Sequence, residues 1–170
     1  MKPEYGFRAL TEKDLPMVRR WMDGVHWRQW WGEADAEIAD IAAHIGSVSV
    51  EPMIAELDGK AIAYVQVYDP HLEDGHPYQD QPTGTLGIDL SIGEADMIHR
   101  GHGSAILSAL AAMLFDEGAP RLVIDPDPAN LAAIRAYEKA GFRAFDTRLI
   151  EYGPALMMAL GNPDFEEEAQ

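Results

Sequence analysis

The chain has 170 residues and no cysteine, and its 29 acidic and 13 basic residues give a formal net charge of −16. This length suits one domain with a sizeable core, and the lack of cysteine excludes disulfides, thiolate metal sites and a cysteine nucleophile. The charge repels nucleic acid and anionic membranes and attracts cations, although solubility alone also explains it. The chain has no signal-peptide core or apolar run of membrane-span length, so we expect a cytoplasmic protein.

The first half of the chain predicts a strand, two helices and a β-hairpin. Thr11 is a suitable N-cap for the first helix, with Asp14 at the capping-box position. Asp58 and Gly59 form a hairpin signal between two strands. The aromatic stretch 25–32 lacks a regular period and is expected to be irregular. The predicted elements are a strand at 5–10, helices at 15–22 and 33–45, and strands at 53–57 and 61–68.

Side chains of two kinds alternate along the strand 61–68. We expect one face to carry Ile62, Tyr64, Gln66 and Tyr68, and the other to carry Ala61, Ala63, Val65 and Val67. The polar face, together with Trp30 and Trp31, suits an aromatic-walled substrate slot. An ordinary core with two satisfied phenols explains the same residues equally well.

The second half predicts a long loop and then alternating strands and helices. The loop at 69–84 is rich in Pro, Gly, Asp and His. For the last helix, Asp127 is the expected N-cap, Pro128 the first residue and Gly141 the C-terminal stop. The remaining predicted elements are a strand at 85–92, a helix at 103–115, and strands at 121–125, 142–148 and 155–160. We expect one α/β domain at 1–161 with a mixed sheet, and a frayed acidic tail at 162–170.

A glycine-rich segment opens the predicted helix at 103–115. Gly101 and Gly103 let backbone N–H groups approach a diphosphate, the helix N-terminus adds partial positive charge, and Arg100 adds a cation. A flexible turn is the alternative explanation. A dinucleotide-binding fingerprint is excluded because the third glycine and the downstream acidic residue are missing.

Three residues are candidates for acid–base chemistry or substrate binding. Asp89 lies in the middle of a strand, where a carboxylate suggests either an ammonium-binding cleft or a salt bridge across the sheet. Tyr137 has a phenol that suits proton donation, or it packs on the helix face. Asp125 ends a strand, where open α/β sheets bind ligands, or it serves a turn. No two histidines stand four residues apart, and there is no His-Glu-x-x-His motif, so a metal site is not expected.

The stretch from Val123 to Phe142 contains the pattern N-x-x-A-x-x-x-Y-x-x-x-G-F, which resembles the GCN5-related N-acetyltransferases (GNAT). The segment at 100–104 is similar to their pyrophosphate loop, with Ile98 in place of the usual Gln or Arg. This resemblance implies a mostly antiparallel sheet with two splayed parallel strands, flanked by helices, and acetyl-CoA as co-substrate without a metal. It implies cofactor contacts from Leu90, Ser91, Ile92, Arg100, Gly101, His102, Gly103, Ser104, Asn130 and Tyr137.

Further motifs look like the aminoglycoside 6′-N-acetyltransferases over roughly residues 8–160. They include Trp30-Trp31-Gly32, Ile54–Gly59, Tyr64–Tyr68 and Gly87-Ile88-Asp89. The resemblance implies a small cationic amine as substrate, with Asp89 and Tyr137 catalytic. It implies a substrate site formed by Trp30, Trp31, Gln66, Tyr68, Asp89 and Asp125.

Two departures leave the natural amine open. The loop at 69–84 differs in composition from that of the resistance enzymes, and Tyr152 stands where an acidic residue would help to bind the drug. The alternatives are an acyltransferase acting on a hydroxylamine or lysine side chain in siderophore synthesis, and a CoA-binding module without turnover. The sequence is compatible with a monomer or a homodimer.

Overall fold

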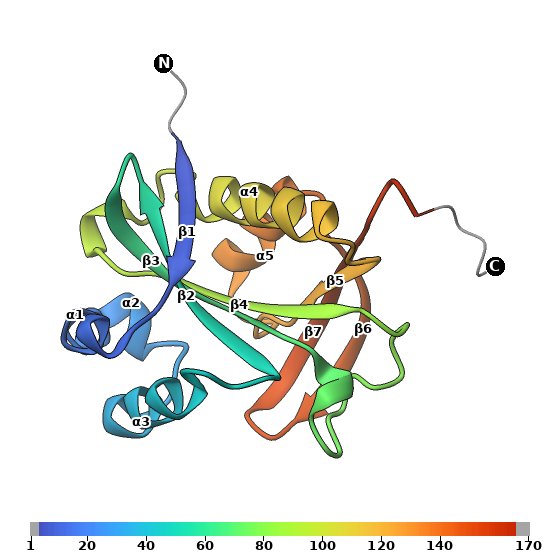
Figure 1. Ribbon diagram of the computed structural model, residues 1–170, viewed down its shortest axis with the longest axis horizontal. Helices are drawn as coiled ribbons and strands as arrows, with labels where there is room; N and C mark the ends of the chain where they lie inside the picture. The colour runs from blue at the N-terminus through green and yellow to red at the C-terminus, as the bar shows by residue number, and fades with distance from the viewer. Residues whose placement is uncertain (1–3, 166–170) are drawn as a thin grey trace.

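The computed structural model of the protein describes residues 4–165 (Figure 1). Its helices are α1 (Leu15–Trp21), α2 (Val25–Arg28), α3 (Ala34–His44), α4 (His102–Asp116) and α5 (Leu131–Lys139). Its strands are β1 (Tyr5–Ala9), β2 (Val50–Leu57), β3 (Lys60–Tyr68), β4 (Leu86–Ile92), β5 (Arg121–Ile124), β6 (Arg143–Ile150) and β7 (Gly153–Gly161).

The seven strands form one mixed sheet in the order β1-β2-β3-β4-β5-β7-β6. All neighbouring pairs are antiparallel except β4 and β5. That parallel pair has only two register pairs, Leu86 with Leu122 and Gly87 with Val123. Beyond Gly87, β4 therefore continues without β5 beside it. The predicted mixed α/β fold with splayed parallel strands is confirmed.

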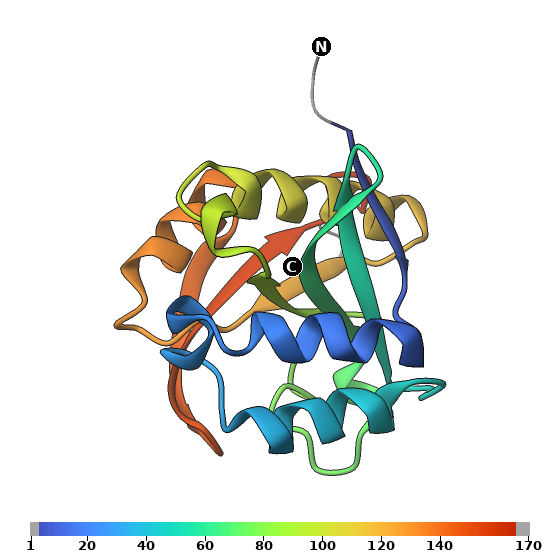
Figure 2. The ribbon, with the colours of Figure 1, turned by 90° about the vertical axis from the view of Figure 1, so that its left-hand side faces the viewer.

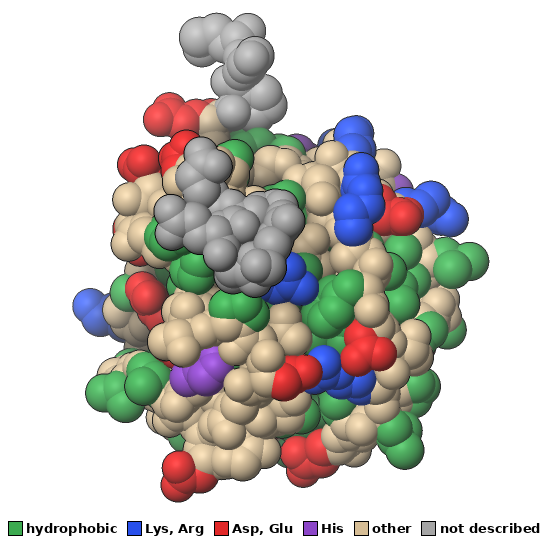
Figure 3. Space-filling view, turned by 90° about the vertical axis from the view of Figure 1, so that its right-hand side faces the viewer, with side chains coloured by type: hydrophobic (Ala, Val, Ile, Leu, Met, Phe, Trp, Pro, Cys, Tyr) green, Lys and Arg blue, Asp and Glu red, His purple; other side chains and the backbone are tan. Residues whose placement is uncertain are grey.

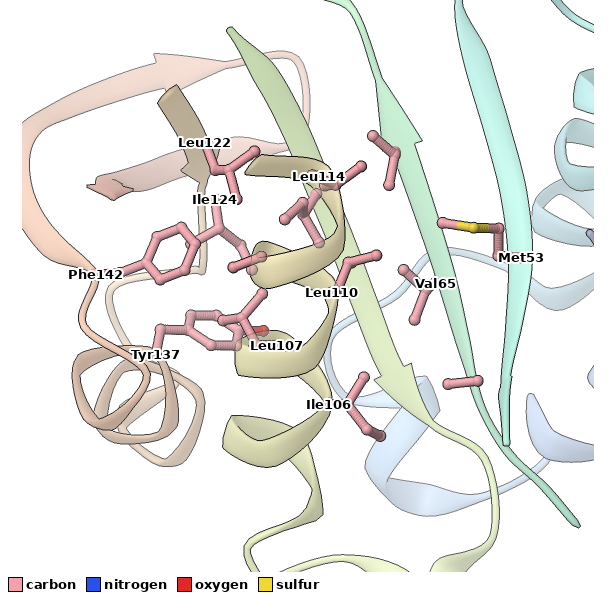
Figure 4. Close-up of a cluster of buried hydrophobic side chains, with 14 of the residues drawn as sticks. Met53, Val65, Ile106, Leu107, Leu110, Leu114, Leu122, Ile124, Tyr137 and Phe142 are labelled. Carbon is pink, nitrogen blue, oxygen red and sulfur yellow. The ribbon is translucent and has the colours of Figure 1, made fainter. Parts of the chain in front are cut away.

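Helices cover both faces of the sheet. On one face α1 and α3 lie side by side (Figure 2) and enclose a cluster around Val18, Trp21, Trp27 and Tyr64. On the other face α4 and α5 cover the larger core, in which Leu107 and Leu110 meet the sheet and Tyr137 (Figure 4). This second core contains side chains of β1 to β5 and of β7.

The expected alternation along β3 is wrong at its start. A β-bulge shifts the register between β2 and β3, so that Ala55 pairs with Ala63 and Glu56 pairs with Ala61. The extra residue, Ile62, packs in the α4–α5 core, while Ala61 packs against the opposite cluster with Tyr64. A single inserted residue moves side chains to the other face because strand periodicity is two.

Three further predictions need correction at element ends. The stretch 25–32 contains a short helix, α2. The last helix begins at Leu131, because Asn130 is its N-cap and accepts from the Ala133 N–H at 3.2 Å, while Asp127 caps the preceding turn through Ala129. Asn162 belongs to the fold, because its buried amide donates to the Ala119 carbonyl at 2.9 Å. Residues 166–170 of the predicted tail lie outside the described residues.

The parallel pair forms against an aromatic ring. The buried Tyr68 ring lies directly over Gly87, so a Cβ at position 87 would meet the ring at 2.0 Å. Glycine at this position lets the end of β3 and the start of β4 close together. The same approach places the Tyr68 ring beside the point where β4 leaves β5.

We expect Gly87→Ala to lower the free energy of unfolding by about 1–3 kcal/mol, because the methyl group overpacks the buried contact with Tyr68. Urea denaturation measures this loss. Gly6→Ala is the matched control, since a Cβ at Gly6 would meet nothing within 4 Å. Equal midpoints for the two variants would contradict the close packing.

Candidate active site

A cavity of about 1070 Å³ opens where β4 and β5 separate. Its walls come from β3, β4 and β5, the segment between α2 and α3, the loop at 69–84, and the turn that joins β6 to β7. The cavity collects all seven side chains that the sequence predicted for catalysis or substrate binding. These are Trp30, Trp31, Gln66, Tyr68, Asp89, Asp125 and Tyr137.

Asp89 projects from β4 into the cavity and is held by Gln66 of β3. The strand register places these two residues opposite each other, and the Gln66 amide donates to Asp89 Oδ2 at 2.8 Å. Gln66 is oriented in turn by Tyr64, whose hydroxyl donates to its Oε1 at 2.5 Å. This chain of hydrogen bonds fixes the Asp89 carboxylate at the cavity wall.

Asp125 follows the last residue of β5 and is held from the opposite side. The Tyr78 hydroxyl donates to Asp125 Oδ2. Tyr78 lies in the loop at 69–84 and is 1% exposed. Tyr78 was not predicted as a site residue. A tyrosine in a loop without periodicity gives no indication in the sequence of where its side chain lies.

The pKa values of both carboxylates lie above the ordinary value for aspartate. Burial, followed by the negative charge of Asp125, raises the pKa of Asp89 to about 7, although the Gln66 hydrogen bond lowers it. Burial also raises the pKa of Asp125, and the Tyr78 hydrogen bond works against that rise. The pair titrates as a coupled unit. An ammonium group between them would favour the doubly ionised form.

Tyr137 reaches the cavity from α5 and is 8% exposed. Burial, together with the charges of Asp89 and Asp125, raises the pKa of its phenol above the ordinary value. The hydroxyl therefore stays protonated at neutral pH and can act only as a proton donor. Figure 4 shows its ring packed between α5 and the side chains of α4.

Aromatic side chains form one wall of the cavity. Trp31 lies 5.2 Å from Trp27 and 6.1 Å from Tyr64 between ring centroids. Of the polar β3 face, Gln66 and Tyr68 line the cavity, whereas Tyr64 is fully buried in the cluster with Trp27. This strand face is therefore divided between the cavity wall and the core.

The cavity has a strongly acidic lining. Seven carboxylates line it, and among the described lining residues there is no lysine or arginine. The outer surface differs, since both acidic and basic side chains appear on the face in Figure 3. The acidic lining residues are Glu37 and Asp40 on α3, Glu73 in the loop, Asp89, Asp125, Asp127, and Glu151 in the β6–β7 turn.

Several of these acidic residues were not singled out from the sequence. Glu37, Asp40 and His44 follow each other at helical spacing, so the polar face of the helix at 33–45 could have signalled them. Tyr152, noted at an expected acidic position, also lines the cavity and is 85% exposed. In the loop at 69–84, Asp80 is occupied by an ion pair with Arg148.

The predicted cofactor residues lie in two places. Leu90 and Asn130 line the cavity, whereas Ser91, Ile92 and the segment 100–104 do not. Gly101 is the N-cap of α4 with a positive φ of 83°, and a Cβ at either Gly101 or Gly103 would meet nothing within 4 Å. The first turn of α4 is thus open to a ligand. His102, the first residue of α4, contacts β1, because the Tyr5 hydroxyl lies 2.7 Å from His102 Nδ1.

The described residues, 4–165, contain no group of three or more His, Asp or Glu side chains placed to hold a metal ion. No described helix is long and apolar enough to cross a membrane.

Comparison with known proteins gives consistent matches. A model of the acetyltransferase (GNAT) domain family matches residues 11–148. The aminoglycoside N(6′)-acetyltransferase type 1 of Klebsiella pneumoniae is 37% identical over 169 residues, covering 94% of this chain and 84% of the relative. The lysine N-acyltransferase MbtK of Mycolicibacterium paratuberculosis is 29% identical over 150 residues, covering 84% of this chain and 67% of the relative.

Solved structures show the same similarity. The structure of AAC(6′)-Ib in complex with paromomycin and acetyl-CoA superposes with a TM-score of 0.86 at 34% identity, covering 98% of each chain.

The coupled carboxylates predict a pH effect on stability. Asp89 has a pKa of about 7 in the folded protein, against about 3.9 in an unfolded chain. Between these values the folded state binds a proton that the unfolded state lacks, so stability falls as pH rises through this window. Asp89→Asn should remove this loss and exceed the wild type by about 1 kcal/mol or more at pH 8.

Urea unfolding at pH 5, 6, 7 and 8 checks this expectation. Asp74→Asn, at an exposed loop position, is the control and should follow the wild type. If the free energy of unfolding depends on pH in the same way for Asp89→Asn and the wild type, burial does not raise the pKa of the Asp89 carboxyl.

Proposed function

The chain belongs to the GNAT acetyltransferase family, and on that premise we propose that it transfers the acetyl group of acetyl-CoA to the 6′-amine of an aminoglycoside-type aminosugar. The observation that carries the proposal is the cavity lined by seven carboxylates and, among described residues, no lysine or arginine. Aminoglycosides carry several ammonium groups, so this lining complements them. Relatives named as aminoglycoside N(6′)-acetyltransferases support the same substrate class.

Several features fit the co-substrate. Past Gly87, no strand of the described residues lies beside the edge of β4 that faces away from β3, so backbone groups of Leu90, Ser91 and Ile92 can bind an extended chain there. The open first turn of α4 suits a diphosphate, with Arg100 beside it. We propose that residues 100–104 bind the diphosphate and that Asn130 binds nearer the acetyl end.

The reaction needs an uncharged amine and a proton for the departing sulfur. When bound, acetyl-CoA supplies the acetyl group as a thioester. Asp89 holds the substrate ammonium and accepts its proton, with Gln66 fixing the carboxylate. Tyr137 is protonated and donates to the sulfur as the C–S bond breaks and the N–C bond forms, and its phenolate then takes up the second proton that the nitrogen loses on becoming an amide. Asp125, Trp30, Trp31 and Tyr68 hold the rest of the sugar.

The other predictions remain as proposals. We propose one catalytic domain that includes Asn162, a cytoplasmic location, and a small-molecule amine partner rather than nucleic acid. The similarity to a lysine N-acyltransferase favours a lysine-type amine as the second candidate substrate. A CoA-binding module without turnover would bind the co-substrate but would have no use for Asp89 or Tyr137.

The substrate is tested by thiol release from acetyl-CoA with a panel of amines. Kanamycin, ribostamycin and neomycin should be turned over, and the apparent affinity should weaken as salt rises, because a charged cavity attracts them. Paromomycin matches neomycin but has a hydroxyl at the 6′ position, so it should release no thiol. A neutral acceptor, or a lysine hydroxylamine, as the best substrate would overturn the proposal.

Two variants separate an enzyme from a binding module. Asp89→Asn should lower kcat/KM for the amine by roughly two orders of magnitude or more, since it removes the base and the charge. Tyr137→Phe should lower kcat with little effect on co-substrate affinity, because the proton is needed only as the bond breaks. Steady-state kinetics measure both effects, and circular dichroism checks folding.

The exposed Asp116→Asn, on the last turn of α4 and outside the cavity, is the kinetic control. Wild-type rates for folded Asp89→Asn would exclude it from the mechanism. Wild-type rates for Tyr137→Phe would assign the proton donor to water.

A further inference from the structure

Tyr78 occupies an unusual place for a loop residue. It lies at the centre of a small core with Val50, Tyr68, Val123 and Met157. Tyr78 also lines the cavity, and its hydroxyl donates to Asp125. A phenylalanine would fill the same core, so packing alone does not require the hydroxyl.

The loop around Tyr78 is fastened to β6 by Arg148. The guanidinium of Arg148 donates to the Pro77 carbonyl at 3.0 Å and pairs with Asp80 at 2.6 Å. Arg148 Nε donates to Asp146 Oδ2 at 2.8 Å. The guanidinium carbon of Arg148, Cζ, lies 5.7 Å from the centre of the Tyr78 ring. Arg148 therefore contacts both neighbours of the segment 78–79 and the face of the ring itself.

The loop is also held from within, around the same tyrosine. The Tyr78 N–H donates to His76 Nδ1 at 3.1 Å, and the two rings lie 5.0 Å apart in an edge-to-face arrangement. Gln79 donates to the carbonyls of Pro70 and Glu73 at 3.1 and 2.6 Å. These contacts give the Tyr78 hydroxyl a defined position.

We propose that Tyr78 is a positioning residue, which acts through Asp125 by holding its carboxylate ionised and aimed at the substrate, and that Arg148 latches the loop that carries it. Its meaning for catalysis rests on the proposed function. The residues that support the site then include the loop at 69–84 and β6, beyond the groups assigned to the reaction.

The sign of the effect follows from the groups around Asp125. Burial raises the pKa of Asp125, while the Tyr78 hydrogen bond stabilises the charged form and lowers that pKa. Losing the hydroxyl should therefore raise the pKa of Asp125. The facing charged and titratable groups are Asp89 on β4, Tyr68 on β3, Tyr137 on α5, Asp127 after β5, Glu73, His76 and Tyr78 in the loop, and Arg148 of β6 behind the Tyr78 ring.

The experiment titrates Asp125 directly, without substrate. Protein labelled with ¹³C at the aspartate carboxyl carbons is followed by NMR in an Asp89→Asn background, which removes the coupled partner. The Asp125 signal is assigned by its loss in Asp125→Asn. Adding Tyr78→Phe should move the Asp125 midpoint up by about one to two pH units. An unchanged midpoint, with or without a lower Tm, would reduce Tyr78 to packing and overturn the proposal.

Variants at Arg148 test the latch and serve if Tyr78→Phe does not fold. Arg148→Met should shift the Asp125 midpoint in the same direction but by less. Arg148→Lys keeps the charge but cannot contact Pro77, Asp80 and Asp146 together, so it should also shift the midpoint. A shift with methionine but none with lysine would make Arg148 only a charge and overturn the latch.

Kinetics then connect the titration to the reaction. In Tyr78→Phe the acid limb of kcat/KM for the amine should move to higher pH, because Asp125 ionises later. Failure of the substrate panel together with a shifted Asp125 midpoint would overturn the proposed function and leave the Tyr78 assignment intact. Turnover of the substrate panel together with an unshifted Asp125 midpoint would overturn the Tyr78 assignment and leave the proposed function intact.

Discussion

The short pairing of β4 with β5 is the constraint on which the site depends. Hydrogen bonding stops after Gly87, and the two strands then diverge. The cavity exists because no strand within residues 4–165 fills that divergence, and Asp89 and Asp125 line it because they follow the last paired residues. Tyr68, seated on Gly87, marks the point at which the strands part.

The site concentrates negative charge in one cavity. Two carboxylates in one poorly solvated cavity are costly unless hydrogen bonds or a cation compensate them. Among the described residues, Gln66 donates a side-chain hydrogen bond to Asp89, and Tyr78 donates one to Asp125. Each donor is itself held, by Tyr64 and by the Arg148 contacts respectively. The compensation is partial, which leaves the cavity with a preference for cations.

Much of the fold could be predicted from the sequence because it depends on local patterns. Strand alternation located β4, and helical spacing with a glycine stop located the end of α5. The prediction of which β3 residues share a face was wrong at the start of the strand. The bulge at Ile62 depends on the pairing of β3 with β2, which the sequence of one strand does not reveal. The predicted start of α5 was wrong because Asp127 and Asn130 are both suitable N-caps. The turn between them determines that Asn130 caps the helix.

The site was predictable where a motif or an unfavourable residue marked it. Asp89 stood out as a charge in a strand, and Asn130 and Tyr137 lay in a family pattern. Tyr78 and Arg148 carried no such mark, because their roles depend on a loop and a strand edge meeting in space. The acidic face of α3 was visible as a pattern, but its direction became clear only once the helix was docked.

The raised pKa of Asp89, about 7, also has a calorimetric consequence. Near neutral pH the carboxylate pair holds a proton in part of the population, and an arriving ammonium group displaces it. Binding is then linked to proton release into the buffer. The heat of association should therefore differ between phosphate and Tris at one pH, although the affinity stays the same. The slope against buffer ionisation enthalpy counts the protons that the cavity gives up.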